Sequence, residues 1–233
     1  MSSRQEAAAT VKVRTLPGQV ASHLVPRIAD NHYPDGQVPS ELQICQEFGV
    51  SRSVAREALK ILASLDIVQI AQGRRVTIRP QEEWDYLNPL LAEWLPEQQV
   101  RQLLRELHGM RLLLEPELAA MAARSIDAQA RTRLHELVDR MAGLEDAPED
   151  YLEADLAFHM EICRAADNRV LDRIMFSARW LMTASRRITN ENPGSLHNAT
   201  ADHRRICTAI EAGQPGRART AMRGHLQRTA PLL

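Results

Sequence analysis

Residues 38–79 constrain the fold more than any other stretch, because they carry two helix starts separated by a single glycine turn. Ser40 followed by Gln43 forms a capping-box pattern, and Ser51 marks a second helix start. Gly49 lies between them, where a helix ends in a left-handed residue. The strand-like segments VQI and VTI then flank AQGRR. This order predicts a helix-turn-helix followed by a basic hairpin, or wing.

The charge of this stretch points to DNA as its partner. Between positions 50 and 80 six Lys and Arg side chains face two acidic ones, whereas the whole chain carries a formal charge of −1. Arg52 and Arg56 lie one turn apart and share a side of the second helix, as entry into a major groove requires. A solvated basic face on an ordinary helix would carry the same two arginines. The capped helices, the glycine turn and the basic wing together favour DNA binding.

The segments VPSE, FGVSRSVAREALKIL and GRR resemble the winged helix-turn-helix of the GntR family of bacterial transcription regulators. The resemblance implies that double-stranded DNA is contacted by Ser51, Arg52, Ser53, Arg56 and the wing tip at Gly73. We add Arg74 and Arg75 of the basic wing to the expected DNA contacts. Two positions depart from the family pattern: Leu42 stands where many members place an arginine, and Arg75 replaces the second wing glycine. Because such domains mirror two-fold protein symmetry in the half-sites, we expect a homodimer on a palindromic operator.

Composition limits the remaining classes. No apolar run reaches the roughly 18 residues that span a bilayer, so no membrane contact is expected. The N-terminal segment lacks the apolar core of a signal peptide, and three cysteines without metal or disulfide spacing fit a reducing compartment. We therefore expect a cytoplasmic protein. A net charge near zero excludes general coating of nucleic acid, so DNA binding must be local.

Hydrophobic spacing predicts a mostly α protein with two domains. We expect a flexible arm over 1–14, the winged helix-turn-helix over 15–79, a linker helix over 80–96 and a helical effector-binding domain over 97–233. The first helix should span 17–32 and be kinked or shortened by Pro26. The linker helix is expected to pack on the domain that follows. From residue 97 onward the spacing predicts six helices and no strand.

Four titratable side chains of the second domain form a candidate metal site. Asp155 and His159 are four residues apart and share a helix face, His203 shares a face with isoleucines, and His225 follows Met222 by one turn. A carboxylate with three imidazoles suits Zn²⁺, and also Ni²⁺ or Mn²⁺. Any one of these histidines alone is more typical of a satisfied core residue than of a metal ligand. Four such groups facing one helical interior favour a site, because unpaired burial is costly. The other histidines are expected to be surface or incidental residues: His23, His32, His108, His135 and His197.

The segments DLAFH and HRRICTAIEAGQPGRARTAMRGHL resemble the FCD effector domain of one branch of the GntR family. The resemblance implies an antiparallel helical bundle that binds a divalent metal through Asp155, His159, His203 and His225. It also implies that Arg111 meets the carboxylate of an acid ligand. Within this branch the chain is most similar to the sugar-acid, galactonate-type operon repressors.

Two functions compete for these features. The first is a transcription regulator, a repressor, whose operator binding is controlled by a small organic acid, here a sugar acid, bound at the metal. The second is a metal-dependent hydrolase or isomerase with an accessory basic domain. An enzyme needs an acid or base beside the metal, and Glu115 and Glu161 have no supporting motif. We predict the regulator, with no catalytic residues.

Overall fold

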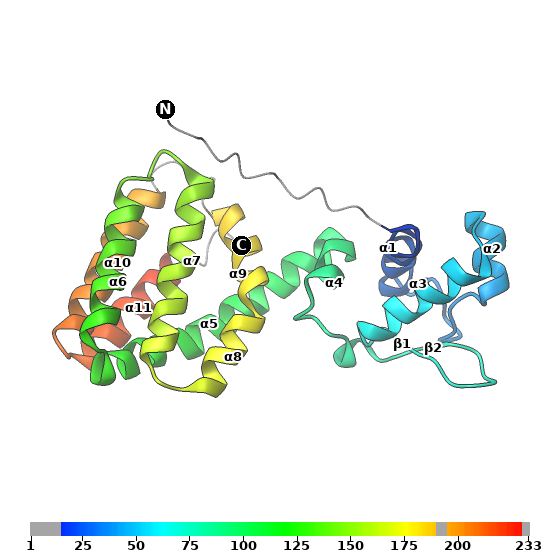
Figure 1. Cartoon of the computed structure of the whole chain (residues 1–233), viewed down its shortest axis with the longest axis horizontal. Coiled ribbons are helices and arrows are strands. Elements are labelled where there is room, and N and C mark those ends of the chain that lie inside the picture. The colour runs from blue at the N-terminus through cyan, green and yellow to red at the C-terminus, as the bar shows by residue number, and fades with distance from the viewer. Residues whose placement is uncertain (1–14, 190–194, 230–233) are drawn as a thin grey trace, which may run out of the picture. The chain divides into compact units, whose positions relative to one another are not determined.

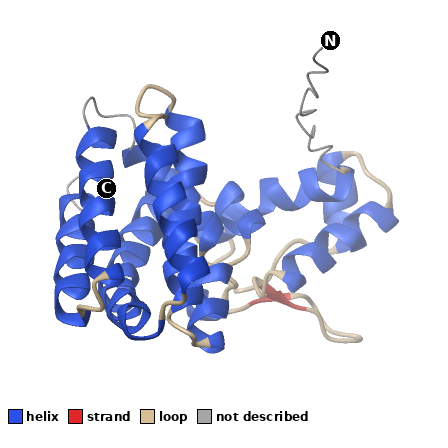
Figure 2. Ribbon diagram, turned by 60° about the vertical axis from the view of Figure 1, so that its left-hand side comes forward, coloured by secondary structure: helices blue, strands red, loops and turns tan. Residues whose placement is uncertain are grey.

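The structure, a computed structural model, describes residues 15–189 and 195–229. The arm expected over 1–14 and the break expected at 192–194 lie outside the described residues. Helices dominate the described chain, which contains a single two-stranded sheet (Figure 2). The chain folds into two compact units, Met1–Pro96 and Glu97–Leu233. The predicted mostly α fold is confirmed. None of the described helices is both long and apolar enough to cross a membrane.

The first unit begins with three helices and a hairpin, followed by a further short helix (Figure 1). Its apolar core joins Val20, Leu24 and Ile28 of the first helix to Ala58 and Leu62 of the third. The hairpin is antiparallel and pairs Val68 with Ile78 and Gln69 with Thr77. The elements are α1 (Leu16–Ala29), α2 (Glu41–Phe48), α3 (Arg52–Ser64), β1 (Val68–Gln69) and β2 (Thr77–Ile78).

The predicted helix caps and glycine turn of the helix-turn-helix are present in the structure. Ser40 and Gln43 form the full capping box at the start of α2, and the Ser51 hydroxyl accepts from the Val54 backbone N–H. Gly49 ends α2 with φ 64°, ψ 31°, in the left-handed region. This residue lets the chain reverse into α3 at little steric cost.

Two details of this unit differ from expectation. The first helix contains Pro26 but ends at Ala29 rather than at residue 32, with Asp30 as its C-cap. Residues 80–96 are not one helix: a 3₁₀ turn (Gln81–Glu83) precedes a short helix α4 (Pro89–Trp94), which packs on α1. Pro89 explains the division, because proline is tolerated at the start of a helix and breaks its interior.

The second unit contains seven helices in its described part, where six were expected. The additional break falls at Ala178, whose ψ of −3° departs from helical geometry without a Gly or Pro to signal it. The helices are α5 (Glu97–Ser125), α6 (Ala128–Ala142), α7 (Pro148–Ala165), α8 (Arg169–Ser177), α9 (Arg179–Thr189), α10 (Ser195–Glu211) and α11 (Pro215–Thr229).

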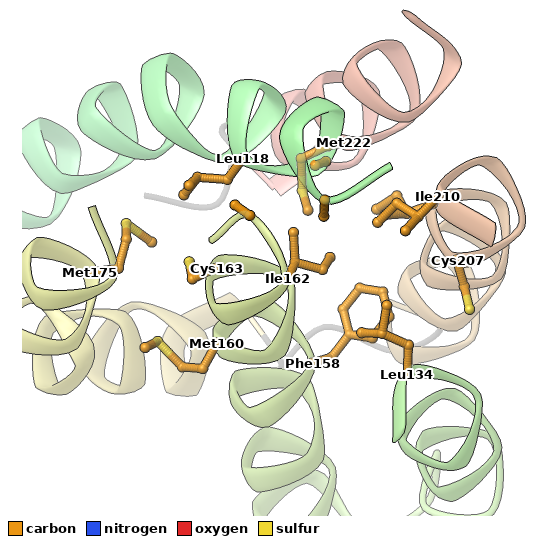
Figure 3. Close-up of a cluster of buried hydrophobic side chains, with 14 of the residues drawn as sticks. Leu118, Leu134, Phe158, Met160, Ile162, Cys163, Met175, Cys207, Ile210 and Met222 are labelled. Atoms are coloured by element: carbon orange, nitrogen blue, oxygen red, sulfur yellow. The ribbon is translucent and has the colours of Figure 1, made fainter. Parts of the chain in front are cut away.

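Helix α7 lies inside this bundle and organises its core. In Figure 3, Phe158 and Ile162 of α7 are surrounded by labelled apolar side chains of α5, α6, α10 and α11. Both side chains are almost fully buried, and each such burial contributes about 1.5–3 kcal/mol. Helix α7 also packs on α8 and α9. An element covered on so many sides must bury its polar side chains too.

Apolar residues recur at helical spacing across residues 170–182, but only some of them lie in the core. Met175, Ala178, Leu181 and Met182 are buried. Val170 is 70% exposed and Ile174 40% exposed. The break at Ala178 explains the difference, since side chains before and after it no longer follow one helical face.

The left-handed turn at Gly49 can be tested with a matched pair of substitutions. A Cβ would meet no heavy atom within 4 Å at either Gly49 or Gly109, so the two sites differ in backbone conformation. Gly49→Ala should lower the free energy of unfolding by about 1–2 kcal/mol, because its φ is positive. Gly109→Ala, inside α5, should raise it by up to about 1 kcal/mol. Urea unfolding of the full chain measures both, and a change of the same sign in the two variants would contradict the assignment.

Candidate functional site

The residues expected to contact DNA lie on one domain and are all exposed. Ser51 caps α3, Arg52 opens it, and Ser53 exchanges a hydroxyl hydrogen bond of 2.8 Å with Ser51. Gly73, Arg74 and Arg75 are exposed in the turn between β1 and β2. The basic side chains therefore gather on the N-terminal half of α3 and on the wing.

Arg56 is exposed and also paired. Its Nε and Nη2 atoms donate to the two carboxylate oxygens of Glu41 at 3.0 and 3.2 Å. These hydrogen bonds lower the pKa of Glu41, so the carboxyl group is ionised at neutral pH. Glu41 belongs to the VPSE motif at the start of α2, and the pair ties the two helices of the motif together.

The wing and α3 border a groove with a volume of about 620 Å³. Gly73 adopts φ 71°, which allows the tight wing turn. Arg75, which stands where the family pattern has a second glycine, donates from Nη1 to Gln37 at 2.9 Å. Leu42 is 53% exposed on α2, so an arginine would be accommodated there. The lining residues include Ser40, Glu41, Arg56, Lys60, Gly73, Arg74 and Arg75.

The second unit brings all four expected metal ligands together. Asp155 and His159 come from α7, His203 from α10 and His225 from α11. Each offers one ligand atom, and these atoms lie within 4.8 Å of one another. All four side chains are buried, with exposed fractions between 0 and 6%. The convergence that spacing alone could not establish is present.

Several imidazole nitrogens of this cluster lack hydrogen-bond partners within the described chain. Asp155 Oδ1 lies 3.5 Å from His159 Nε2 and 3.0 Å from His203 Nε2. Yet both nitrogens are fully buried and form no hydrogen bond within the described chain. Such short distances without hydrogen-bond geometry are typical of ligand atoms that face a common point. Leaving these groups unsatisfied would cost about 1–3 kcal/mol each.

Two buried carboxylates stand behind the histidines. Glu115 on α5 accepts from His159 Nδ1 through one oxygen and from Arg111 Nε through the other. Asp202 on α10 lies 3.7 Å from His225 Nδ1 and accepts from Arg228 at 2.7 Å. Carboxylates in these places orient an imidazole and select the nitrogen that is left for a metal.

The electrostatic environment of the cluster favours neutral histidine rings and ionised carboxyl groups. Burial lowers the pKa of His203 and of His225 well below the usual value, so both rings are neutral at pH 7. Burial alone would raise the pKa of Glu115, but Arg111 and His159 outweigh it and hold that pKa well below its usual range. Burial opposes His225 and Arg228 at Asp202 in the same way, and the pKa there falls to about 2. Neutral histidine is the form that binds metal ions.

Two arginines and one further histidine are also buried in this unit. Arg111, the residue expected to meet an acid, is 4% exposed and bound to Glu115. Arg186 on α9 is also 4% exposed, and its Nε donates to Asp155 Oδ2. His108, one turn before Arg111, is 8% exposed, and its Nε2 has no partner in the described chain. The expectation that His108 is a surface or incidental residue is therefore wrong as to its burial.

Sequence reasoning missed Asp202, Arg186 and His108, and it considered Glu115 only as a catalytic acid. The spacing of Arg111 and Glu115, four residues apart on one helix, was an available signal for their pairing. His108 and Arg111 are likewise one turn apart. Nothing in the sequence around Arg186 indicates that α9 carries it towards Asp155.

Comparison with known protein families gives one match in each of the two units. Residues 16–78 match the family described as bacterial regulatory proteins, gntR family, and residues 106–228 match the FCD domain. The Glc operon transcriptional activator of Escherichia coli K12 is 31% identical over 221 residues, 89% of this chain and 85% of its own. LutR of Bacillus subtilis 168 is 29% identical over 206 residues, 86% of this chain and 92% of its own.

Two further proteins broaden the comparison. The galactonate operon transcriptional repressor of Escherichia coli K12 is 24% identical over 154 residues, 66% of this chain and 67% of its own. Among solved structures, a GntR protein of Streptococcus agalactiae has 25% identity and a TM-score of 0.53, covering 92% of this chain and 99% of its own. With the helix-turn-helix and the helical effector domain both matched, the chain belongs to the GntR family and carries an FCD domain, so it is a DNA-binding transcription regulator and not an enzyme.

Proposed function

We propose that this regulator is a repressor whose operator binding is controlled by a small organic acid, a sugar acid, bound at a divalent metal in the second unit. The observation that carries the proposal is the buried cluster of Asp155, His159, His203 and His225, in which each imidazole has at least one buried nitrogen without a hydrogen bond in the described chain. The relative named as the galactonate operon transcriptional repressor supports a sugar acid as effector and repression as the mode of action.

The donor set fits a divalent metal ion. One carboxylate oxygen and three neutral imidazoles suit Zn²⁺ best, with Ni²⁺ or Mn²⁺ as alternatives. When bound, the ion would supply a Lewis-acid centre for an oxygen atom of the effector. Glu115 holds His159 by its Nδ1, and Asp202 faces Nδ1 of His225, which leaves the Nε2 atoms for the metal.

Arg111 is the residue that we assign to the effector's carboxylate. Its Nε donates to Glu115, which leaves the two terminal amino groups as the part of the side chain to meet a carboxylate. A planar guanidinium fork matches a carboxylate with two parallel hydrogen bonds. Glu115 bonds both Arg111 and His159, so one carboxylate positions the effector contact and a metal ligand together.

The signal can pass along the chain itself. Helix α5 begins at Glu97, the first residue of the second unit, and carries both Arg111 and Glu115. An effector that moves these side chains acts on the helix that continues directly from residues 80–96. Binding that favours one position of α5 then changes operator affinity, provided the two states bind the effector unequally.

We further propose that the protein acts as a homodimer on a palindromic operator. The second unit exposes several large apolar side chains, and exposed apolar clusters mark association surfaces. Val170, Ile174 and Phe176 are 70, 40 and 49% exposed on α8, and Leu113 is 75% exposed on α5. Two winged domains related by such an association would read two inverted half-sites.

The DNA assignment predicts the effect of two arginine substitutions. Arg52→Ala and Arg56→Ala should each weaken binding to a selected operator roughly ten- to a hundredfold, since a specific base contact is worth about 1–3 kcal/mol. Arg101→Ala, which removes an equal charge from α5, should leave affinity unchanged. The operator is selected from random DNA with the native protein and should contain an inverted repeat. Fluorescence anisotropy gives the affinities, and native affinity in both variants would refute the assignment.

The metal assignment predicts a joint loss. His203→Ala should lower bound metal to well below one ion per chain, lower the melting temperature of the metal-loaded protein and abolish operator release by acids. The matched control His135→Ala removes an exposed imidazole that pairs with Glu211, and it should change none of the three. Mass spectrometry of the metal and thermal unfolding with and without a chelator provide the readouts. If the native protein binds no metal and chelation changes nothing, the histidines are core residues.

The effector assignment separates Arg111 from the metal ligands. Arg111→Ala should keep the metal content while operator release by acids disappears. Arg111→Lys should restore the charge but not the response, because an ammonium group lacks the planar fork. Metal analysis and operator binding in the presence of sugar acids measure the two properties. A normal acid response in Arg111→Ala would place the carboxylate elsewhere.

A further inference from the structure

A groove of the second unit lies between α10 and α11, and none of the four candidate metal ligands lines it. Its volume is about 570 Å³, which is enough for a small organic molecule. The two helices pack against each other, and a short turn joins them. The lining residues are Arg204, Arg205, Thr208, Ala209, Ala212, Gln214, Arg217 and Ala221. Most of them are exposed, so the groove opens to solvent.

Helical spacing and small side chains explain why a groove forms there. Arg204, Thr208 and Ala212 follow one another at four-residue intervals, so they lie along one face of α10 and the turn after it. Arg217 and Ala221 repeat this spacing on α11. Alanine and threonine fill little of the space between two helices, whereas longer side chains would close it. The groove therefore combines small side chains with arginines, and both kinds come from both helices.

Positive charge is concentrated in this part of the second unit. Residues 97–233 contain 19 Arg and 19 Asp or Glu, whereas residues 203–229 contain six Arg and one Glu. That one acidic residue, Glu211, bonds to His135 at 3.0 Å and does not line the groove. None of the lining residues is acidic. The charge of the arginines is therefore not offset within the groove.

Two of the three arginines keep all their side-chain donors available. Arg205 donates from Nη1 to Asp202 Oδ1 at 2.6 Å. The side chains of Arg204 and Arg217 form no hydrogen bond or ion pair with any residue that the structure describes. Each guanidinium group carries five N–H donors. The groove thus presents many donors and a positive charge to a ligand.

Phosphate is the chemical group that this arrangement suits best. A phosphate monoester carries about 1.5–2 negative charges near neutral pH and presents three acceptor oxygens. Guanidinium groups match it with parallel hydrogen bonds. A carboxylate has one charge and two oxygens, so it would satisfy fewer arginines. The alanines beside the arginines leave room for the organic part of such a molecule.

We propose that the groove between α10 and α11 binds a small organic phosphate, whose phosphate group is held by Arg204, Arg205 and Arg217. The organic part packs against the small side chains of the two helices. This site goes beyond the proposed acid-responsive function and does not depend on it, because neither Arg111 nor any candidate metal ligand lines the groove.

Matched pairs of compounds test the requirement for phosphate. The full-length protein is titrated calorimetrically at constant ionic strength with glucose 6-phosphate and glucose, and with AMP and adenosine. In at least one pair the phosphate should bind ten times tighter or more, the worth of about one charge-assisted hydrogen bond. The same compound should raise the melting temperature more than sulfate does at equal ionic strength. The pair that responds distinguishes a sugar phosphate from a nucleotide, and no preference in either pair would overturn the proposal.

Variants then locate the binding. Arg204→Gln and Arg217→Gln should each weaken the affinity for that phosphate about tenfold or more. The control Arg223→Gln removes an equal charge from an exposed position of α11 outside the groove, and it should leave the affinity unchanged. Ala212→Leu keeps every charge but fills part of the groove, so it should weaken binding as well. Thermal unfolding shows whether each variant is folded.

The remaining outcomes separate a site from a general attraction of anions. Equal weakening in Arg223→Gln, or native affinity in Ala212→Leu, would show that anions are attracted by the charge of α11 alone, and the proposal would be wrong. If the native protein prefers neither phosphate but Arg204→Gln and Arg217→Gln lose affinity for random DNA, the arginines contact DNA phosphates instead. Operator release by acids should be normal in all four variants, so the proposed function is tested separately.

Discussion

The burial of one side of α7 inside the second unit is the constraint on which the rest of the candidate metal site depends. The same helix contributes Phe158 and Ile162 to the apolar core and Asp155 and His159 to the polar cluster. Because these two polar side chains are buried, they need partners from neighbouring helices. Helices α5, α9, α10 and α11 provide them, so packing and ligand chemistry are one arrangement.

Shared carboxylates connect the candidate metal ligands to the two buried arginines. Glu115 and Asp155 each divide their two oxygens between an arginine and the imidazoles. A change in the occupancy of the histidines therefore alters the charge felt by Arg111 and Arg186. Since Arg111 lies on α5, the first helix of the unit, the site has a covalent route towards the DNA-binding domain. This sharing of groups explains how a small acid could bias a regulator without catalysis.

The winged domain uses charge differently, on a solvated surface. Its core is apolar and joins α1 to α3, while Arg52, Arg56 and the wing arginines remain exposed. Glu41 holds Arg56 in a bidentate pair across α2 and α3. An exposed pair of this kind contributes little stability.

The local features of this protein followed from its sequence, because caps, glycine turns and helical periodicity depend on near neighbours. Ser40 with Gln43, Gly49 and Ser51 set the helix-turn-helix, and the i, i+4 spacing put Asp155 beside His159. The break at Ala178, the burial of His108 and the contact of Arg186 with Asp155 had no such local signal. Tertiary packing alone decided these three features, because each depends on which side of one helix faces another. Hydrophobic spacing does not determine that orientation when several helices pack around one core.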